Sequence, residues 1–310
     1  MSMSMERMVV AVSVATVWTN PQSSRSLDAP ALQQPAAIRS WLENMALEDR
    51  LDLYSSNRIQ TQAVYGTSVL AVEEQGDWVK VLIPQQGTRK EAGGYPGWIP
   101  RCQLVSESTE LASSKRAEVI TNTAWLYLTP AEPLIELSFL SSLPVLEAAD
   151  PWIKVHIPGA EGIGYVKAEE VRLINGFLSP KPGSGHVGQF ILDRAMQFLD
   201  LPYLWGGMSA FGYDCSGFAH SMHRYAGISI PRDASDQVHY GTSIEKDRLE
   251  PGDLLFFAYE EGKGAVHHVG IYAGGGRMIH SPETIKSIEV VELSSYKLIK
   301  EHCMSRRYWE

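Results

Sequence analysis

The sequence predicts a multidomain protein in which two small all-β barrels precede a domain of the α+β class. Its 310 residues exceed what one hydrophobic core ordinarily serves, so two or three domains are expected. Short strand patterns fill about the first 175 residues and occur in two similar sets. After a stretch rich in glycine and proline, residues 175–186, the pattern changes to a helix followed by strands.

The first barrel is expected over residues 8–110. Its opening strand is residues 9–17, where valines alternate with small residues, and residues 21–35 are expected to form a loop. Apolar side chains at helical spacing predict one inserted helix over residues 36–47. Further strands are expected at residues 69–72, 78–83 and 97–99.

The second barrel, over residues 111–175, repeats the first on a smaller scale. GDWVKV at 76–81 resembles ADPWIKV at 149–155, and GWI at 97–99 resembles GYV at 164–166. Two copies of one small barrel explain these pairs. A tryptophan-led strand followed by Gly-Trp-Ile resembles the bacterial SH3-like (SH3b) domains, which implies an SH3-like barrel for both copies. Strands of the second copy are expected at residues 125–128, 143–147, 152–156 and 164–166.

The third domain is expected over residues 176–310. Apolar residues at positions i, i+4, i+7 and i+8 predict an amphipathic helix over residues 187–199. A second helix is expected over residues 216–225, ended by Gly227. Strands are expected at residues 254–258, 269–273 and 278–280.

Cys215 is the predicted nucleophile of this domain. It follows a glycine-rich turn, residues 206–212, and stands at the start of the second helix. The unpaired backbone N–H groups and the dipole at a helix N-terminus favour a thiolate, so a lowered thiol pKa is expected. The same N–H groups can hold a developing oxyanion. Asp214 is the expected N-cap, and the alternative for Cys215 is a buried, inert thiol.

His268 and His280 are the expected base and its orienting group, because a thiol at neutral pH needs a base. In HHVGIY, residues 267–272, strand alternation puts His267 and His268 on opposite faces. A Cys-His-polar triad then has His268 as base and His280 as its orienting partner. The alternative for each is a surface or hydrogen-bonded strand residue, and His267 is assigned to that class.

The placement of His280 depends on the register of a hairpin. If the three glycines at residues 274–276 form a three-residue loop, Ala273 pairs with Arg277. His280 then lies on the face of His268, one diagonal step away, where side chains can still meet. A two-residue loop would place His280 on the opposite face.

A metal site is not expected. His220 and His223 share a face of the second helix. They lie about 140° and about 80° around that helix from Cys215, so the three side chains do not converge well on one ion. The wide spacing of the cysteines, Cys102, Cys215 and Cys303, makes a zinc ribbon or a disulfide framework unlikely. No cofactor is expected.

Five other residues have an expected role. Arg232 and Asp233, in PRDAS at residues 231–235, are expected to contact substrate or to form an ordinary ion pair. Asp253, in the turn before a buried strand, is expected to be structural. Cys102 and Cys303 are also expected to be structural.

The composition narrows the classes of partner. With 27 basic and 36 acidic residues, the net charge is −9, which disfavours nucleic acid and anionic membranes as partners. No apolar run of 18 residues occurs, so no transmembrane helix is expected. Apolar residues 8–18 are expected to form a strand rather than a signal segment, because their flank lacks positive charge. A cytoplasmic protein is therefore expected, with export as the alternative.

Segments of the third domain resemble the NlpC-type cell-wall peptidase family, which is papain-like. They are PYLWGG (202–207), DCSGF (214–218), PRDAS (231–235), PGDLLFF (251–257), HHVGIY (267–272) and the later His280, all within about residues 185–305. The resemblance implies a papain-like fold with Cys215 as nucleophile and His268 as base. It further implies His280 as the third member and Tyr203 near the oxyanion. Such enzymes cleave the bond between γ-D-glutamate and a diamino acid in peptidoglycan peptides.

Two SH3b-like domains ahead of this domain resemble the YkfC-type γ-D-glutamyl-L-diamino acid endopeptidases. In that group the first SH3b domain lines the site and restricts it to a free N-terminal L-Ala, a role in the recycling of murein peptides. The resemblance implies that Asp214, Ser216 and Tyr95 bind the substrate ammonium. The alternative for Tyr95 is an aromatic side chain packed beside Trp98.

The sequence departs from the family pattern at two positions. Thr67 follows Tyr65-Gly66 where an acidic residue is expected. Ala234 stands where a hydroxyl is expected. Both departures concern the recognition of the substrate amine and leave the predicted triad intact.

Three functions remain to be separated. The leading one is a cysteine endopeptidase that cleaves small murein peptides with a free N-terminal L-Ala. The second is an exported wall hydrolase whose SH3b domains bind intact peptidoglycan. The third is a non-catalytic wall-binding protein, which the presence of Cys215, His268 and His280 disfavours. The sequence leaves open the preferred diamino acid, meso-diaminopimelate or L-lysine, and the oligomeric state.

Overall fold

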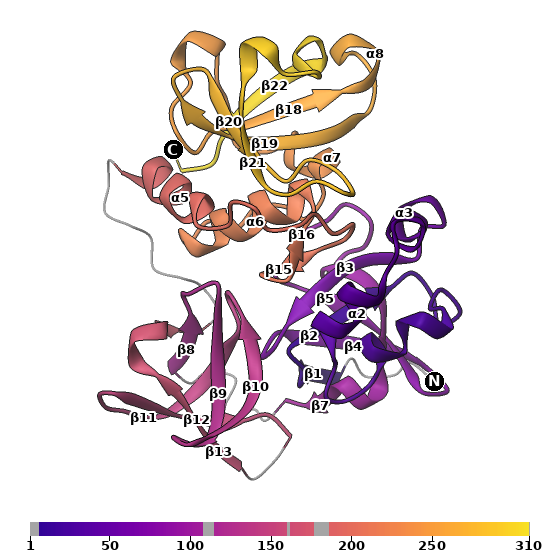
Figure 1. The fold of residues 1–310 in the computed structure, drawn as a ribbon, viewed down its shortest axis with the longest axis vertical. Helices are drawn as coiled ribbons and strands as arrows, with labels where there is room; N and C mark the ends of the chain where they lie inside the picture. The colour runs from indigo at the N-terminus through magenta and orange to yellow at the C-terminus, as the bar shows by residue number, and fades with distance from the viewer. Residues whose placement is uncertain (1–5, 108–114, 160–161, 177–185, 310) are drawn as a thin grey trace. The chain divides into compact units, whose positions relative to one another are not determined.

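The structure is a computed structural model that describes residues 6–107, 115–159, 162–176 and 186–309 (Figure 1). The chain forms two compact units. Unit 1 comprises Met1–Pro84, Gly93–Leu178 and Met208–Phe211, and unit 2 comprises Gln85–Ala92, Ser179–Gly207 and Gly212–Glu310. A short segment between two strands of the first barrel therefore belongs to unit 2. The predicted domain boundaries at residues 110 and 175 stay predictions, and most of the predicted linker lies outside the described residues.

The first barrel is a seven-stranded antiparallel sheet in the order β3-β2-β6-β5-β4-β1-β7. Its interior is filled by apolar side chains that alternate along the strands, among them Val17, Val79 and Ile99. Its strands are β1 Glu6–Val10, β2 Val14–Trp18, β3 Ile59–Val64, β4 Ser68–Gln75, β5 Trp78–Ile83, β6 Tyr95–Pro100 and β7 Leu104–Ser106.

The second barrel has the order β10-β9-β13-β12-β11-β8-β14, which is the order of the first with each strand number raised by seven. The predicted repeat is confirmed. Its strands are β8 Lys115–Val119, β9 Thr123–Thr129, β10 Glu132–Ser138, β11 Ser142–Ala148, β12 Trp152–Ile157, β13 Gly162–Lys167 and β14 Val171–Asn175.

The glycine of the GWI and GYV motifs has the same packing role in both copies. A Cβ on Gly97 would lie 2.4 Å from Val17 Cγ1, and a Cβ on Gly164 would lie 2.7 Å from Leu126 Cδ1. Both distances are below normal contact. Only glycine lets the strand approach its neighbour so closely at this point of the barrel.

The N-terminal region is more divided than the sequence pattern predicts. The single strand expected over residues 9–17 is two strands, β1 and β2, because Val9 pairs with Ser68 of β4 whereas Val14 pairs with Val64 of β3. The chain turns between two sides of the barrel at residues 11–13. Alternation of apolar residues continues through this turn, so periodicity alone could not detect it.

The single inserted helix expected over residues 36–47 is also wrong. Met45 is extended and ends α2, and the Ala46 N–H donates to the Asp49 carboxylate at 3.0 Å, which starts α3. The loop expected at residues 21–35 contains helical turns. The helices of this insertion are η1 Ser26–Asp28, α1 Ala29–Leu32, α2 Ile38–Asn44 and α3 Leu47–Ser55, and the barrels carry the 3₁₀ turns η2 Arg101–Gln103 and η3 Ala168–Glu170.

Unit 2 has the predicted α+β class. Its main sheet has the order β17-β22-β18-β19-β20-β21, and helices α5 and α6 pack against β19 on one side of it (Figure 1). The helices of this part of the chain are α5 Val187–Met196, α6 Cys215–Tyr225, α7 Ala234–Gln237, α8 Tyr259–Gly262, η4 Lys246–Arg248, η5 Leu293–Ser295 and η6 Ile299–Glu301. The strands of unit 2 are β16 Gly212–Tyr213, β17 Thr242–Ser243, β18 Leu254–Ala258, β19 Val266–Gly274, β20 Arg277–His280, β21 Glu289–Glu292 and β22 His302–Arg307, whereas β15 Met208–Ser209 belongs to unit 1.

The two predicted helices are confirmed as α5 and α6. The buried face of α6 carries Phe218, Ala219 and Met222, all at most 1% exposed. Helix α5 ends at Met196, three residues before the predicted end. Among the described residues, no helix is both long and apolar enough to span a bilayer.

Candidate active site

The start of helix α6 positions Cys215. Asp214 has extended backbone angles, and its Oδ1 accepts the Gly217 N–H at 2.7 Å, so it is the N-cap that the sequence predicts. Cys215 is the first helical residue, and its thiol also accepts the backbone N–H of Val269 in β19. The packing of α6 on β19 therefore places the thiol beside the residue that follows His268.

His268 and His280 lie side by side on neighbouring strands. His268 pairs with Phe257 of β18, and its Nε2 lies 2.8 Å from Nδ1 of His280 in β20. Both rings are buried, at 4% and 1% exposure. The predicted shared face of the two histidines is confirmed.

The hairpin that joins them differs from the predicted three-residue loop. Gly274 pairs with Arg277, so the loop has only two residues, Gly275 and Gly276, both with positive φ. The register nevertheless continues as predicted, with Ile271 opposite Ile279. A bulge at Ala273 adds one residue to β19 and offsets the shorter loop.

Burial determines the charge states of the free site. Burial, and then the Asp214 carboxylate, raises the pKa of the Cys215 thiol to about 12. Burial and the neighbouring His280 hold the pKa of His268 well below its ordinary value. The expected lowering of the thiol pKa is therefore wrong, because desolvation outweighs the helix terminus and the Arg232 cation. Both shifts favour a neutral thiol and a neutral imidazole in the free site.

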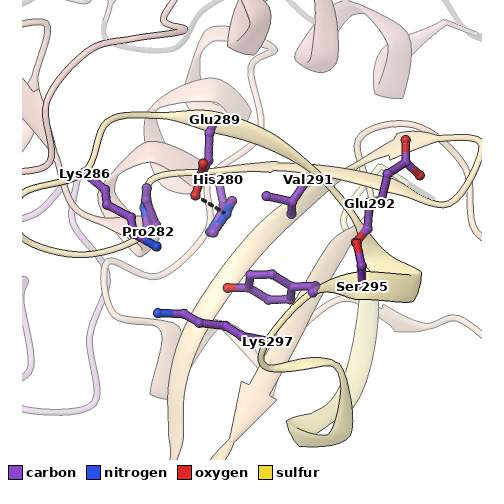
Figure 2. A pocket seen from close by; sticks show the side chains of 9 residues that line it. His280, Pro282, Lys286, Glu289, Val291, Glu292, Ser295 and Lys297 are labelled. Carbon is purple, nitrogen blue, oxygen red and sulfur yellow. Dashed lines mark hydrogen bonds and ion pairs between the residues drawn. The ribbon is translucent and has the colours of Figure 1, made fainter.

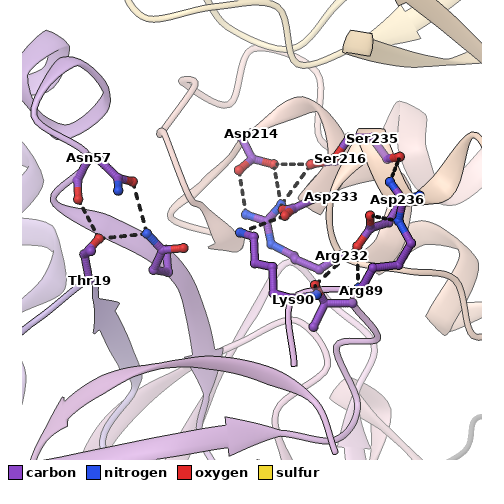
Figure 3. A network of polar contacts seen from close by, with 12 residues as sticks. Thr19, Asn57, Arg89, Lys90, Asp214, Ser216, Arg232, Asp233, Ser235 and Asp236 are labelled. Carbon is purple, nitrogen blue, oxygen red and sulfur yellow. Dashed lines mark hydrogen bonds and ion pairs between the residues drawn. The ribbon is translucent and has the colours of Figure 1, made fainter. Parts of the chain in front are cut away.

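Asp214 and Ser216, the residues on either side of Cys215 in the sequence, both bind the buried Arg232 guanidinium (Figure 3). Arg232 Nη2 lies 2.5 Å from Asp214 Oδ2, and Arg232 Nη1 donates to Ser216 Oγ at 2.9 Å. Ser216 Oγ in turn lies 3.2 Å from Asp214 Oδ1. The Arg232 side chain is 1% exposed, so its guanidinium fixes Asp214 and Ser216 rather than facing solvent.

The Gln85–Ala92 segment of unit 2 supports this pair. The Gly87 carbonyl accepts the Arg232 N–H at 2.8 Å. Arg89 Nε donates to Asp236 Oδ1 at 2.7 Å, and the Arg89 N–H donates to Asp236 Oδ2 at 2.9 Å (Figure 3). The segment comes between β5 and β6 in the chain. A sequence insertion in the first barrel thus helps to position Arg232.

The predicted oxyanion residue Tyr203 and the other predicted substrate-binding residues lie in different places. Asp233 is the N-cap of α7, and its carboxylate pairs with Lys90 at 3.0 Å. Tyr203 is buried in unit 2, and its N–H donates to Lys286 O at 2.9 Å. Tyr95 is 2% exposed in β6 and belongs to the core of the first barrel. Of the two alternatives for Arg232, the structure shows the ion pair.

Comparison with known proteins identifies the family. Residues 200–309 match the NlpC/P60 family, and residues 119–173 match the YKFC SH3b2 domain. A gamma-D-glutamyl-L-lysine dipeptidyl-peptidase of Bacillus subtilis (strain 168) is 45% identical over 295 residues, covering 95% of this chain and 96% of its own. This chain belongs to the NlpC/P60 family. NlpC/P60 is a family of cysteine peptidases, and the chain is one of them.

Two further comparisons match this chain over nearly its whole length. A gamma-D-glutamyl-L-lysine dipeptidyl-peptidase of Bacillus cereus (strain ATCC 10987 / NRS 248) is 38% identical over 301 residues, covering 96% of this chain and 89% of its own. The crystal structure of an NlpC/P60 family protein from Bacillus cereus ATCC 10987 is 36% identical, with a TM-score of 0.91. That match covers 98% of this chain and 100% of the other. The likeness thus includes both barrels as well as the NlpC/P60 domain.

His267, His220 and His223 each have a hydrogen-bond partner within unit 2. His267 lies 2.6 Å from Glu301 and stacks on Tyr259. His220 Nε2 lies 3.2 Å from Gln85 O, and His223 Nδ1 lies 2.8 Å from Ala219 O. Within the part of the chain that the structure describes, no three side chains of metal-ligating type gather.

The remaining structural predictions hold in part. Asp253 is fully buried, and its carboxylate accepts two hydrogen bonds from the Arg307 guanidinium, both 2.8 Å long. This bidentate ion pair is consistent with a structural role. Cys303 lies in β22, where its thiol donates to Phe256 O at 3.4 Å. Cys102 is exposed at η2 and donates to Leu32 O at 3.4 Å.

Sequence reasoning missed three contributors to the site. Tyr296 packs edge-on against His280, with ring centroids 5.2 Å apart. Gln237 donates to Ser216 O at 3.1 Å and to Pro231 O at 2.8 Å, which ties α7 to the start of α6. The Gln85–Ala92 segment is the third. None carries a local motif, since each acts through a contact distant in sequence.

Proposed function

We propose that this cysteine peptidase cleaves the bond between γ-D-glutamate and a diamino acid in small murein peptides with a free N-terminal L-Ala. The observation that carries the proposal is the buried His268–His280 pair, in which His268 precedes Val269, the residue whose backbone N–H meets the Cys215 thiol. Two relatives that match nearly the whole chain are named gamma-D-glutamyl-L-lysine dipeptidyl-peptidases, which supports the same bond and an L-lysine or related diamino acid after it.

In the first step, the Cys215 sulfur attacks the γ-carbonyl carbon of D-glutamate. Because Nε2 of His268 faces His280, Nδ1 is the nitrogen left to accept the thiol proton. The C–S bond forms as the carbonyl oxygen becomes an oxyanion. We assign its stabilisation to the N–H groups at the start of α6 and to Tyr203.

In the second step, the tetrahedral intermediate collapses. The C–N bond breaks, and the leaving amine of the diamino acid takes the proton from His268 Nδ1. A thioester between Cys215 and L-Ala-γ-D-Glu remains. Water, deprotonated by His268, then attacks the thioester, and the thiol regains its proton as L-Ala-D-Glu leaves. Atoms and protons balance with one water consumed per bond.

We assign recognition of the substrate ammonium to Asp214 and Ser216. Their polar atoms lie together at the start of α6, next to the nucleophile. Arg232 already neutralises part of the Asp214 charge, so Ser216 Oγ and the free lone pairs of the carboxylate are the available acceptors. The roles of Tyr95 and Asp233 stay predictions. Thr67 lacks the carboxylate that the family pattern has at that position. Ala234 lacks the hydroxyl that the pattern has at its position.

A free L-Ala terminus arises only after murein has been cut from its glycan strands, since in intact murein that nitrogen is acylated. A preference for the free amine therefore fits the recycling of released peptides in the cytoplasm. Equal use of acylated and free peptides fits an exported wall hydrolase.

A hydrolysis assay with mass-spectrometric readout tests the proposal. L-Ala-γ-D-Glu-meso-diaminopimelate, its L-lysine counterpart and their N-acetylated forms are offered to the protein. We expect L-Ala-D-Glu and the free diamino acid from the free-amine peptides, and a loss of about 10²-fold or more in kcat/KM on acetylation. Equal cleavage of both forms would favour the wall hydrolase, and no cleavage of any peptide would refute the substrate class.

The pH dependence of the same reaction follows from the buried histidine. His268 acts as base only while neutral, and burial moves its pKa well below the ordinary 6.5. As pH falls, activity is therefore expected to persist through 6.5 and to fall only as the lowered pKa is passed. The measurement is kcat/KM from about pH 4 to pH 9. An acid limb centred at or above 6.5 would show that His268 is not the desolvated base described above.

A further inference from the structure

A cavity opens on the side of His280 away from His268 (Figure 2). Strand β21 and the segments on either side of it supply most of its wall, together with the His280 ring itself. Figure 2 shows the Glu289 side chain directed at this ring from above. The lining residues are His280, Pro282, Lys286, Glu289, Val291, Glu292, Ser295, Tyr296 and Lys297.

The unused nitrogen of His280 faces this cavity. Nδ1 of His280 is taken by His268, and Nε2 is buried without a hydrogen-bond partner among the described residues. The ring as a whole is 1% exposed. A buried polar atom of this kind ordinarily has a partner, so its nearest charged neighbour is a candidate.

Two proton arrangements are open to the His268–His280 pair. In the productive one, His268 Nε2–H donates to His280 Nδ1, and His268 Nδ1 is free to accept the thiol proton. His280 then carries its own proton on Nε2. In the unproductive one, His280 Nδ1–H donates to His268 Nε2, and His268 carries its proton on Nδ1, where it cannot act as base. The heavy-atom distance is the same in both.

The sheet register places Glu289 where it distinguishes these arrangements. His280 and Glu289 are directly opposite each other in the antiparallel pair of β20 and β21. Glu289 Oε1 lies 3.7 Å from His280 Nε2. The Glu289 side chain is 43% exposed, which leaves it room to rotate and bring its oxygen within hydrogen-bond distance.

The other charges around His280 do not replace Glu289. Lys286 and Lys297 both pair with Glu283, at 3.2 and 2.6 Å. Burial and these two lysines lower the pKa of His280, and the Glu283 carboxylate between the lysines opposes this shift. Glu289 is the carboxylate opposite the ring in the sheet, and it favours a proton on Nε2.

We propose that Glu289 is a positioning residue for catalysis that holds His280 in the Nε2–H tautomer and so keeps His268 Nδ1 free to act as base. The proposal rests on the roles of Cys215 and His268 given under the proposed function. When His268 takes the thiol proton, the Glu289 carboxylate also faces the positive charge that develops along the histidine pair. Glu289 contacts neither substrate nor the reacting atoms in this role.

The first test reads the tautomer without any turnover. In the Cys215→Ala protein, two-bond ¹H–¹⁵N correlation spectra of the imidazoles report which nitrogen of each ring is protonated. We expect Nε2–H for His280 with Glu289 present, and a mixed or Nδ1–H pattern after Glu289→Ala. An unchanged His280 pattern after Glu289→Ala would overturn the proposal, whatever the peptidase activity proves to be.

The second test reads catalysis in the protein with Cys215 intact. Glu289→Ala is expected to lower kcat about tenfold with KM unchanged, by analogy with other residues that orient a catalytic group through a neighbour. Glu289→Gln keeps an oxygen acceptor without the charge and is expected to lose less. Glu292→Ala, which removes another carboxylate of the same cavity, is the matched control and should leave kcat unchanged. Equal losses in Glu289→Ala and Glu292→Ala, or a kcat within twofold of the parent for Glu289→Ala, would overturn the proposal.

Discussion

Replacing Cys215 with alanine is expected to lower kcat/KM for the free-amine murein peptide by about 10⁴-fold or more. Neither of the other two cysteines, Cys102 and Cys303, has a histidine pair next to it among the described residues. Neither is therefore expected to replace the lost nucleophile. The measurement is product formation followed by mass spectrometry. Residual binding of the peptide by the inactive protein is expected to persist, because the residues assigned to the ammonium are unchanged.

Cys303→Ala is the matched control for this change. Cys303 is also half-buried, but its thiol donates to a backbone carbonyl in β22 and has no histidine partner among the described residues. Its loss should leave kcat/KM within about twofold of the parent. Alkylation by iodoacetamide should inactivate the parent protein in step with modification of Cys215. Peptidase activity that survives in Cys215→Ala would refute the assigned nucleophile.

Replacing Arg232 with alanine is expected to reduce the free energy of unfolding of the protein by about 3–5 kcal/mol. The change leaves the Asp214 carboxylate buried at 9% side-chain exposure without its cationic partner, and removes a donor to Ser216. Because Asp214 caps the helix that carries Cys215, the geometry of the nucleophile is expected to suffer as well. Urea unfolding and kcat/KM at low temperature measure the two effects.

Arg307→Ala separates local from global consequences. Arg307 forms a comparable buried pair with Asp253, at 2.8 Å, on the sheet of the same unit. A similar loss of stability is expected there, because a buried carboxylate again loses its partner. At a temperature where both variants are folded, kcat/KM should fall in Arg232→Ala and stay near the parent in Arg307→Ala. Equal activity in the two variants would show that Arg232 serves stability alone.

The start of α6 illustrates what could be predicted from sequence. Asp214, Cys215 and the apolar spacing up to Tyr225 all act within one helix, through bonds between residues at most four apart. Interactions between residues this close in the sequence can be predicted from the sequence alone. The same holds for the repeated barrel, since the glycine in GWI and GYV is required by the strand packed next to it in both copies.

The position of His280 shows a correct prediction that rests on a wrong detail. The shared face with His268 is confirmed, but the loop has two residues and a bulge at Ala273 adds the missing one. Bulges follow from how two strands fit together, and the alternation of apolar residues does not mark them. The split of residues 9–17 into two strands was not predicted from the sequence for the same reason.

The sequence by itself determined the order of domains, the repeat and the helix that begins at Cys215, because these depend on neighbours along the chain. Only the tertiary structure decided the pairing of Arg232 with Asp214, the membership of Gln85–Ala92 in unit 2, and the place of Glu289 opposite His280. It also reversed the expected pKa shift of the Cys215 thiol. All four depend on burial or on contacts between distant segments, which exist only once the chain has folded. For the thiol, desolvation then outweighs the local electrostatics of the helix terminus.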